Sequence, residues 1–334
     1  MAEPVATVVI PNYNGMPYLP HLMGSLAAQS DRRLGILVVD DASSDDSVAY
    51  LRGQWPDANV IRNERNLGFA GSCNRGLSGA KTPFVVLLNN DTHVDADWLA
   101  EGLRPFDADD IGSVASLVLL ADGPDRVDTA GDLYSVAGGA VKRGHRLPRG
   151  AAEKLPRACF SPSAASAFYR LEALKRVGGL DDRFESYYED VDLGFRLAWA
   201  GYRCVFAPAS VCYHHLSASY DPKGWRYHFN SARNAEIVWQ AHMPATLRRK
   251  YHAAHLLFLL MQAMNKARQG CLRPYLAGKW AVLRHRRHIA EKRAADRRLA
   301  RVGPRDIEAL LVRDWWKLHL AGTRRRLRDS ERSR

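Results

Sequence analysis

The sequence predicts an α/β protein with a mainly parallel central sheet flanked by helices, followed by a basic helical C-terminal region. Over the first 120 residues, short runs rich in Val, Ile and Leu alternate with segments whose apolar residues recur at helical spacing. Such alternation is typical of a sheet whose strands are buried by helices on both faces. From residue 241 the composition shifts to helix formers, His and Arg, which predicts the added helical region.

The expected elements of the N-terminal part alternate along the chain. Apolar runs that end in turn or polar residues predict four strands, within 6–14 ("ATVVIPNYN"), 35–45 ("GILVVDDASSD"), 59–63 ("NVIRN") and 83–92 ("PFVVLLNNDT"). Helical spacing predicts helices within 18–30 and 66–80.

The rest of the body is less regular. Residues 121–163 are rich in Gly, Pro and charged residues and predict a long connection with one or two short strands, which could form a flap over the site. A strand and then a helix closed by a Gly pair are expected within 163–180. After a further helix that begins near Glu189, "YRCVFAP" (202–208) and "SVCYHHLS" (210–217) predict two short strands.

Charge is divided unevenly along the chain. Residues 1–240 carry 24 Lys and Arg against 29 Asp and Glu, whereas residues 241–334 carry 24 against 7. We therefore expect two domains, an acidic body over 1–240 and a basic helical region over 241–334. A basic region favours binding to phosphate groups, which lipid headgroups, nucleic acids and anionic substrates all carry.

Composition limits the class of protein. The 334 residues are 46% hydrophobic and 25% charged, as in ordinary globular proteins. The five cysteines are widely spaced and form no CxxC pair, which favours reduced thiols in the cytoplasm over a disulfide framework or a zinc site built on cysteine. The sequence shows no signal pattern and no apolar run near the roughly 20 residues of a spanning helix. We expect a cytoplasmic protein, with the inner face of the cell membrane as a further location.

Polar side chains gather where the predicted strands end. They are Asn12, Asp40, Asp41, Asn89, Asn90 and Asp91. Ligands of open parallel sheets bind at the carboxyl ends of the strands, and a nucleotide diphosphate is held by amides, carboxylates and a divalent metal. His214 ends an apolar run and is a candidate metal ligand; the alternatives are a structural His214 and a helix-capping Asp91. The chain has no GxGxxG or GxxxxGK[ST] sequence, so neither a Rossmann dinucleotide site nor a P-loop is supported.

Six motifs together carry a family resemblance. They are "VVIPNYNG" (8–15), "VVDDASSDDS" (38–47), "NLGFAGSCNRG" (66–76), "LLNNDT" (87–92), "VGGLDDRFESYYEDVDLGFRLAWAGYRC" (177–204) and "VCYHHLSAS" (211–219). In this order and spacing they resemble the family 2 inverting glycosyltransferases of the GT-A fold, and among these the rhamnosyltransferase-like enzymes of bacterial cell-surface polysaccharides. The resemblance covers residues 5–240 of the chain.

The resemblance implies a site for a nucleoside-diphosphate sugar and a divalent metal, Mg²⁺ or Mn²⁺. The residues expected at the donor are Pro11, Asn12 and Tyr13 in the first nucleotide loop, Asp41 at the pyrimidine base with Asp40 beside it, and Asn66, Gly68 and Asn74 along the ribose and diphosphate. Asn89, Asn90 and Asp91 occupy the family's DxD position, with Asn in place of the first acid. Asp91 is therefore expected to be the carboxylate on the metal, with Asn90 a neutral neighbour and His214 a second ligand.

The resemblance also implies the catalytic base. Glu189 and Asp190 match the family's ED motif, whose Asp takes the proton of the acceptor hydroxyl in a single displacement that inverts the anomeric centre. Glu189 is the second candidate for this role. From the residues alone, the alternative is helix capping, because carboxylates in a first helical turn interact well with its free N–H groups. "SPSAASAFYR" (161–170) departs from relatives that have Gly before the small residues, so the acceptor side is expected to differ in shape.

The subgroup narrows the expected substrates. A dTDP-rhamnose donor comes first, ahead of UDP- and GDP-sugars, and a cell-surface glycan or a lipid-linked intermediate is the expected acceptor. A sugar-nucleotide pyrophosphorylase is the alternative enzyme, but "PNYNGMPYLP" (11–20) lacks the Arg and Lys of its phosphate loop. A nucleic-acid-binding protein is the other alternative, which the acidic body and the lack of a base-stacking aromatic array disfavour, so no nucleic-acid partner is expected.

Three stretches of the basic region predict contact with an anionic membrane. "HLLFLLMQAM" (255–264) offers an apolar helical surface, "LRHRRHIAEKRAADRRL" (283–299) a basic helix, and "DWWKLHLAGTRRRLR" (314–328) two tryptophans beside an Arg cluster. The alternative is that 256–264 packs on the body and that the Arg residues form a solvated face.

Overall fold

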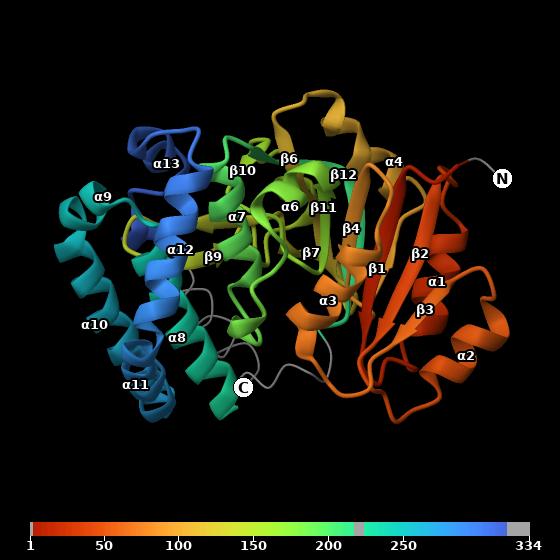
Figure 1. Cartoon of the computed structure of the whole chain (residues 1–334), viewed down its shortest axis with the longest axis horizontal. Helices are drawn as coiled ribbons and strands as arrows, with labels where there is room; N and C mark the ends of the chain where they lie inside the picture. The colour runs from red at the N-terminus through yellow and green to blue at the C-terminus, as the bar shows by residue number, and fades with distance from the viewer. Residues whose placement is uncertain (1–2, 217–223, 319–334) are drawn as a thin grey trace.

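The structure, a computed structural model, describes residues 3–216 and 224–318 (Figure 1). Its centre is a ten-stranded sheet with the main strand order β10-β12-β6-β11-β4-β1-β2-β3. The first four strands are β1 (Ala6–Asn12), β2 (Leu34–Asp40), β3 (Asn59–Arg62) and β4 (Phe84–Leu88). They pair in parallel, and their register sets Asn12 beside Asp40. The predicted parallel sheet is thereby confirmed.

The other half of the sheet is mixed. It contains β5 (Thr92–Val94), β6 (Ile111–Leu120), β7 (Gly123–Thr129), β10 (Ala158–Cys159), β11 (Ser166–Arg170) and β12 (Arg203–His214). Strand β11 runs antiparallel to both β4 and β6, whereas β12 runs parallel to β6. A separate hairpin pairs β8 (Asp132–Tyr134) with β9 (Ala140–Lys142).

Two expectations about this half were wrong, and one strand was missed. Strand β6 was not predicted, although it is buried along nearly its whole length. The two short strands expected within 202–217 form one strand, β12, because a register shift between Ala207 and Val211 keeps both parts paired with β6. The connection 121–163 holds four short strands and the short helix α5 (Arg149–Ala152), more than the one or two strands expected.

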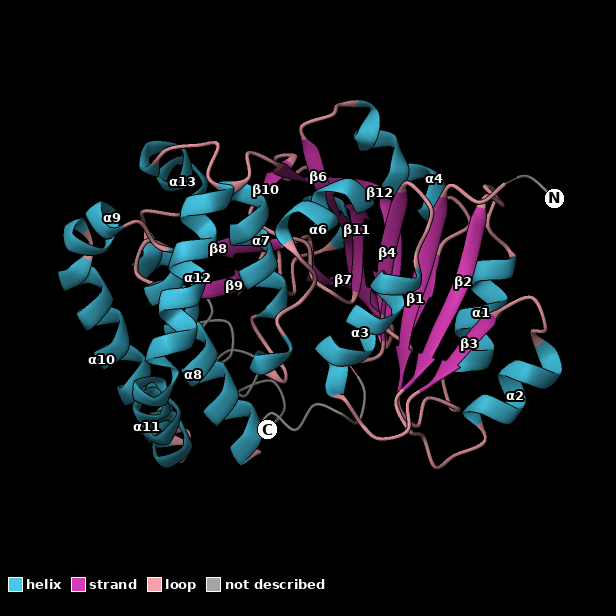
Figure 2. Cartoon of the chain, in the orientation of Figure 1, coloured by secondary structure: helices cyan, strands magenta, loops and turns pink. Residues whose placement is uncertain are grey.

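Helices cover both faces of the sheet because alternate strand residues point to opposite sides. Side chains from α1 (Leu19–Ala27), α2 (Ser47–Gln54) and α4 (Trp98–Leu103) pack in one cluster with Val8, Ile10 and Val86. Those from α3 (Gly68–Gly79), α6 (Leu171–Val177) and α7 (Glu189–Trp199) pack in another with Val9 and Leu87. Figure 2 shows the resulting layers. Two 3₁₀ turns, Arg104–Asp107 and Asp182–Phe184, complete the connections.

The C-terminal region is helical, as predicted, and packs against the body beside α7 (Figures 1 and 2). It contains α8 (Trp225–His242), α9 (Ala245–Lys250), α10 (His252–Arg268), α11 (Leu272–Ala281), a 3₁₀ turn (Val282–His285), α12 (Arg286–Leu299) and α13 (Pro304–Leu310). The domain boundary expected at residue 240 falls within the last turn of α8. A search of the described helices finds none with the length and apolar character needed to cross a bilayer.

A buried ionic network joins α7 to this helical region. The Asp192 Oδ1 atom lies 2.7 Å from His242 Nε2 and 2.6 Å from Lys292 Nζ, and Asp192 Oδ2 accepts a hydrogen bond of 2.9 Å from Arg196 Nε. Burial alone would raise the pKa of Asp192, but Lys292, Arg196 and His242 together hold it well below its usual range. His242 Nδ1 in turn lies 2.7 Å from Asp296 Oδ2, so α7, α8 and α12 share one charge network.

We expect Asp192→Asn to destabilise the protein by about 3–5 kcal/mol at pH 7, because removing one member of a buried ionic cluster leaves the others with an uncompensated charge. The lowered pKa of Asp192 means that this contribution is complete at neutral pH and is lost only as the pH falls below about 4. Urea unfolding measures the effect. Asp31→Asn, which breaks an exposed pair with Arg33, is the control and should change stability little. Equal small effects of both changes would contradict the role of Asp192.

Candidate active site

The carboxyl ends of β1, β2 and β4 are tied together by one buried amide. Asn12 Nδ2 donates to Asp40 Oδ1 over 3.0 Å, and Asn12 Oδ1 accepts from Asn90 Nδ2 over 3.0 Å. Pro11, which precedes it, is also buried, whereas Tyr13 is 54% exposed. The structure therefore brings the predicted first loop and the Asn-Asn-Asp segment together, with Tyr13 open to solvent beside them.

Asp41 organises the start of α3. Its Oδ1 atom accepts hydrogen bonds from the Leu67 N–H over 2.7 Å and from Asn63 Nδ2 over 2.8 Å, and its Oδ2 atom accepts from the Gly68 N–H over 2.9 Å. Gly68 has a φ of 77°, which favours glycine there. Asn66 Oδ1 accepts from the same Gly68 N–H over 3.0 Å. A buried carboxylate thus holds the loop that was expected to line the donor.

An open cavity of about 410 Å³ lies beside these residues. Ala42, Arg62, Asn63 and Glu64 line it, directly after the two carboxylates at the end of β2. Asp40 is fully buried beneath it and accepts a hydrogen bond from the Ser43 N–H over 3.2 Å.

Asn74 makes contacts that the sequence did not predict. Its Nδ2 atom donates to the Leu180 carbonyl over 2.7 Å, and its Oδ1 atom accepts from the Leu180 N–H over 2.8 Å. Its amide therefore fixes the chain that leads to α7. A direct contact of Asn74 with a nucleotide stays a prediction.

Asp91 and His214 face each other across strands β5 and β12. Asp91 Oδ1 lies 3.3 Å from His214 Nε2, close to the ~3 Å that separates two adjacent ligands of one octahedral ion with bonds of about 2.1 Å. The side-chain Oδ1 of Asn89, two residues before Asp91, is buried without a hydrogen-bond partner in the described part of the chain. One carboxylate, one imidazole and a nearby unpartnered carbonyl oxygen suit a hard or borderline divalent cation.

Asp128 was missed by the sequence analysis and stands behind His214. Its Oδ2 atom lies 3.1 Å from His214 Nδ1, and its Oδ1 atom accepts from Lys142 Nζ over 2.6 Å. A carboxylate on the far ring nitrogen fixes the tautomer and orientation of an imidazole ligand. Burial opposes the imidazolium, but Asp128 and Asp91 raise the pKa of His214 to about 9. No motif marks Asp128, which lies in the segment expected to be a long connection with one or two short strands.

Glu189 and Asp190 begin α7 and differ sharply in their contacts. Asp190 Oδ1 accepts from the Val191 N–H over 2.8 Å, and Asp190 Oδ2 accepts from the Ala164 N–H over 3.4 Å. Glu189 is buried, and its Oε2 atom has no hydrogen-bond partner in the described residues. Burial and then the Asp190 charge raise the pKa of Glu189 to about 8, and burial also raises the pKa of Asp190. The carboxyl of Asp190 therefore interacts with free backbone N–H groups, as the capping alternative expects, whereas one oxygen of Glu189 has no partner in the described residues.

The chain before α7 is held in an unusual conformation. Glu185, Tyr187 and Tyr188 have φ values of 64°, 73° and 72°, in the region that non-glycine residues rarely adopt. Asn234 of α8 clamps this segment: its Nδ2 lies 3.0, 3.0 and 2.9 Å from the carbonyl oxygens of Phe184, Ser186 and Tyr187. Backbone strain of this kind persists only where the surroundings enforce it, and it is enriched at functional sites. The sequence gave no signal for Asn234, which lies in a long helix.

We expect Glu189→Gln to make the protein more stable at pH 8. In the unfolded chain the carboxyl loses its proton near its ordinary pKa of 4.5, whereas in the folded protein it keeps the proton up to a pKa of about 8. Between these values the raised pKa costs stability, so the gain from Gln should grow with pH, reaching on the order of 1–3 kcal/mol. Thermal unfolding from pH 4.5 to 8 measures it. Glu153→Gln on the surface should show no such trend, and a pH-independent effect of Glu189→Gln would contradict the burial argument.

The sequence of the chain is similar to those of known glycosyltransferases. Residues 7–178, just over half of the chain, match the model of "Glycosyl transferase family 2". The chain is 28% identical to the O-antigen biosynthesis protein RfbC of Myxococcus xanthus, over 65% of the chain and 18% of the relative. It is 32% identical to the pre-mycofactocin glycosyltransferase of Mycobacterium tuberculosis, over 62% of the chain and 42% of the relative. The matches thus span less than half of the length of these two relatives.

A third relative is matched over more of its length. The chain is 28% identical to the N-acetylglucosaminyl-diphospho-decaprenol L-rhamnosyltransferase of Mycobacterium tuberculosis, over 64% of the chain and 77% of the relative.

Two solved structures share the fold at low identity. GalNAc-T7 with UDP, GalNAc and Mn²⁺ superposes with a TM-score of 0.58 at 16% identity, over 75% of this chain and 50% of that one. The mannosyltransferase PcManGT of Pyrobaculum calidifontis with GDP-Man and Mn²⁺ superposes with a TM-score of 0.54 at 19% identity, over 90% and 86%. The expected GT-A fold is confirmed. Because the family model spans more than half of the sequence, the chain belongs to glycosyl transferase family 2.

Proposed function

We propose that this glycosyltransferase is inverting and metal-dependent, and that it moves a sugar, with L-rhamnose as first choice, from a nucleoside diphosphate to a hydroxyl of a cell-surface glycan or lipid-linked acceptor. The observation that carries the proposal is that Asp190 and the segment 89–91, which contains Asp91, contact the same loop at residues 164 and 165. Ala165 accepts a hydrogen bond from the Asn89 N–H over 3.1 Å, and its neighbour Ala164 donates to Asp190. The segment that contains Asp91 and the proposed base Asp190 are therefore hydrogen-bonded to two adjacent residues of one loop.

The family assignment favours sugar transfer over the pyrophosphorylase and nucleic-acid alternatives. The preference for rhamnose rests on the third relative, whose matched length is the greatest of the three reported. The preference for a divalent metal rests on Asp91 and His214, whose ligand atoms are 3.3 Å apart, and on the Mn²⁺ present with both solved neighbours.

In the proposed mechanism, Asp190 is the general base. Its carboxylate removes the proton of the acceptor hydroxyl while that oxygen forms a bond to the anomeric carbon, and the bond from this carbon to the diphosphate breaks on the opposite face. The transition state is oxocarbenium-like, as in glycoside hydrolysis. The raised pKa of Asp190 suits this role, because a more basic carboxylate takes the proton more readily. Asp91 and His214 would hold the metal, which when bound offsets the charge that develops on the leaving diphosphate.

Glu189 has a different place in the proposal. Its carboxyl is buried and protonated at neutral pH, with a pKa of about 8. A protonated carboxyl donates a hydrogen bond, so Glu189 suits an acceptor hydroxyl oxygen better than proton abstraction. It remains the second candidate for the base.

The C-terminal helices carry a surface that suits a membrane. Half or more of each of seven large apolar side chains is exposed on α10, α11 and the following 3₁₀ turn: Leu256, Leu257, Leu260, Met264, Leu276, Trp280 and Leu283. We call these residues the apolar face. On the inner side of α10, His255 and Phe258 are buried. One side of α10 therefore packs on the protein, as the packing alternative expects. Its other side presents leucines to solvent, which that alternative does not explain.

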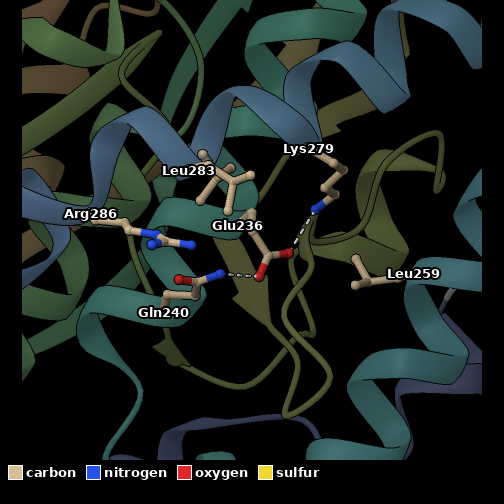
Figure 3. A pocket seen from close by; sticks show the side chains of 7 residues that line it. Glu236, Gln240, Leu259, Lys279, Leu283 and Arg286 are labelled. Carbon is tan, nitrogen blue, oxygen red and sulfur yellow. Dashed lines mark hydrogen bonds and ion pairs between the residues drawn. The ribbon is translucent and has the colours of Figure 1, made fainter.

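Cations stand beside the apolar face. Figure 3 shows Lys279 and Arg286 around Glu236, in a hollow of about 260 Å³ that Leu283 also lines. Lys279 Nζ lies 3.0 Å from Glu236 Oε2, whereas Arg286 is exposed and has no ion pair within the described residues. Apolar side chains with a tryptophan and flanking cations favour the interface of an anionic bilayer, where each cation contributes about 1 kcal/mol. Of the stretch 314–328, only 314–318 lies within the described residues.

We expect Asp190→Asn to lower the turnover rate by about 10²–10⁴ while leaving donor binding intact, because the amide cannot accept the proton. Steady-state kinetics with the preferred sugar nucleotide, together with calorimetric donor binding, measure the two quantities. Glu189→Gln is the matched change at the neighbouring position. If Asp190→Asn turns over normally and Glu189→Gln is inactive, the base is Glu189.

We expect Asp91→Ala and His214→Ala to weaken metal-dependent binding of the nucleoside diphosphate, with Asp91 the more severe because it supplies the charge. Asp128→Asn should weaken it by roughly 10–100-fold, the usual effect of losing the partner that orients a ligand. Titration of the nucleotide with Mn²⁺ and with EDTA measures the difference. Asp125→Asn, exposed on the same strand as Asp128, is the control. Activity that persists in EDTA, with unchanged donor affinity of the Asp91 variant, would contradict the metal site.

We expect the full chain to sediment with anionic vesicles at low salt and to be released as salt rises, because cations and apolar side chains act together. Leu260→Glu combined with Trp280→Glu should abolish sedimentation. Leu310→Glu, at an exposed position on α13 outside the apolar face, should not. Equal recovery in the supernatant with anionic and neutral vesicles would contradict membrane contact.

A further inference from the structure

Three histidines from distant parts of the chain meet beside the site but outside it. His21 lies on α1, His93 lies in β5, and His215 directly follows β12. One ring nitrogen from each lies within 4.8 Å of the other two. None of the three was expected to be functional from the sequence.

The middle ring of this cluster stacks on two neighbouring rings and has an unsatisfied atom. His93 stacks on Tyr213 with ring centroids 4.6 Å apart, and on His21 with centroids 4.0 Å apart. Its Nδ1 atom is buried without a hydrogen-bond partner in the residues that the structure describes. A buried polar atom left without a partner costs about 1–3 kcal/mol, and a ligand at the cluster is one way to recover that cost.

We propose that His21, His93 and His215 form a second metal site, which takes a borderline divalent transition metal of the Zn²⁺ class. Imidazole binds zinc well, whereas hard cations prefer oxygen ligands. Three histidines with an open fourth position make a common zinc site. Bonds of about 2.0–2.1 Å bring tetrahedral ligand nitrogens to about 3.3 Å, so the cluster must contract on binding. His21 is exposed, which leaves its ring free to turn away from the stack toward the ion.

The donor set separates this site from Asp91 and His214. Three nitrogens without a carboxylate disfavour Mg²⁺, whereas Asp91 gives the other site the oxygen ligand that Mg²⁺ and Mn²⁺ prefer. The two sites are linked by a backbone hydrogen bond, in which the His215 N–H donates to the Asp91 carbonyl over 3.0 Å. Zinc on the three histidines would therefore brace β5, α1 and the end of β12 behind the proposed donor site. The site itself does not depend on the proposed sugar transfer.

Zinc binding to the full chain, free of any affinity tag and stripped with chelator, tests the proposal without measuring activity. The measurement is made on Asp91→Ala, because the carboxylate site proposed above could also take zinc. After dialysis against Zn²⁺ alone, Asp91→Ala should retain one zinc per chain and unfold at a higher temperature than the same variant stripped of metal. Co²⁺ in its place should give the visible absorption of a tetrahedral ion. Adding His21→Ala should remove both signals, and because His21 is exposed this variant is expected to fold.

Two further variants locate the ion. His252→Ala removes an exposed histidine of α10 outside the cluster and should retain zinc. Asp91→Ala itself should retain zinc, because that residue belongs to the other site. No zinc on Asp91→Ala, or zinc on it that survives the addition of His21→Ala, would overturn the proposal. Zinc on the wild type but not on Asp91→Ala would place the ion at the carboxylate site and would also overturn it.

Discussion

Helix α7, which begins with the proposed base, is held in place by a buried ionic network around Asp192. Asp192 lies two residues after Asp190. Its carboxylate contacts Arg196 of its own helix, His242 of α8 and Lys292 of α12. A buried ionic cluster of this kind contributes little net stability over an apolar core, but it admits few geometries because every member needs its partners. The network therefore fixes the direction in which α7 begins, and with it the positions of Glu189 and Asp190. The basic C-terminal region is thus a structural part of the site.

The three acids that open α7 differ in their partners. Asp190 accepts backbone hydrogen bonds, Glu189 is buried without a partner for one oxygen, and Asp192 is ion-paired. Capping rules predicted that acids favour a helix start, and this holds for Asp190. They could not assign Asp192, because its partner Lys292 lies 100 residues further along the chain and no local pattern links the two.

The parallel half of the sheet could be predicted because each strand there ends in a recognisable polar group, and Asn12, Asp40 and Asn90 meet as expected. The mixed half could not. Strand β6 is buried on both faces, so its residues show no alternation, and an apolar run of this kind does not reveal its own direction or neighbours. Asp128 was missed with it, since β7 is a strand only through its pairing with β6. Asn234 is a third case: a buried amide on a helix becomes informative only when the carbonyls that it holds are known.

Stability is lowered at the site and regained around it. Glu189, Asp190 and Asp132 are carboxyls with raised pKa values in a buried space, and burial is the main cause for each. Three strained residues precede Glu189 and Asp190. Such an arrangement holds only if neighbouring contacts outweigh it. Asn234 clamps the strained segment itself, and the network around Asp192 holds the helix that follows it. The residues proposed to act on substrate are therefore unfavourable for the fold, and contacts that hold them come from α8 and α12, far along the chain.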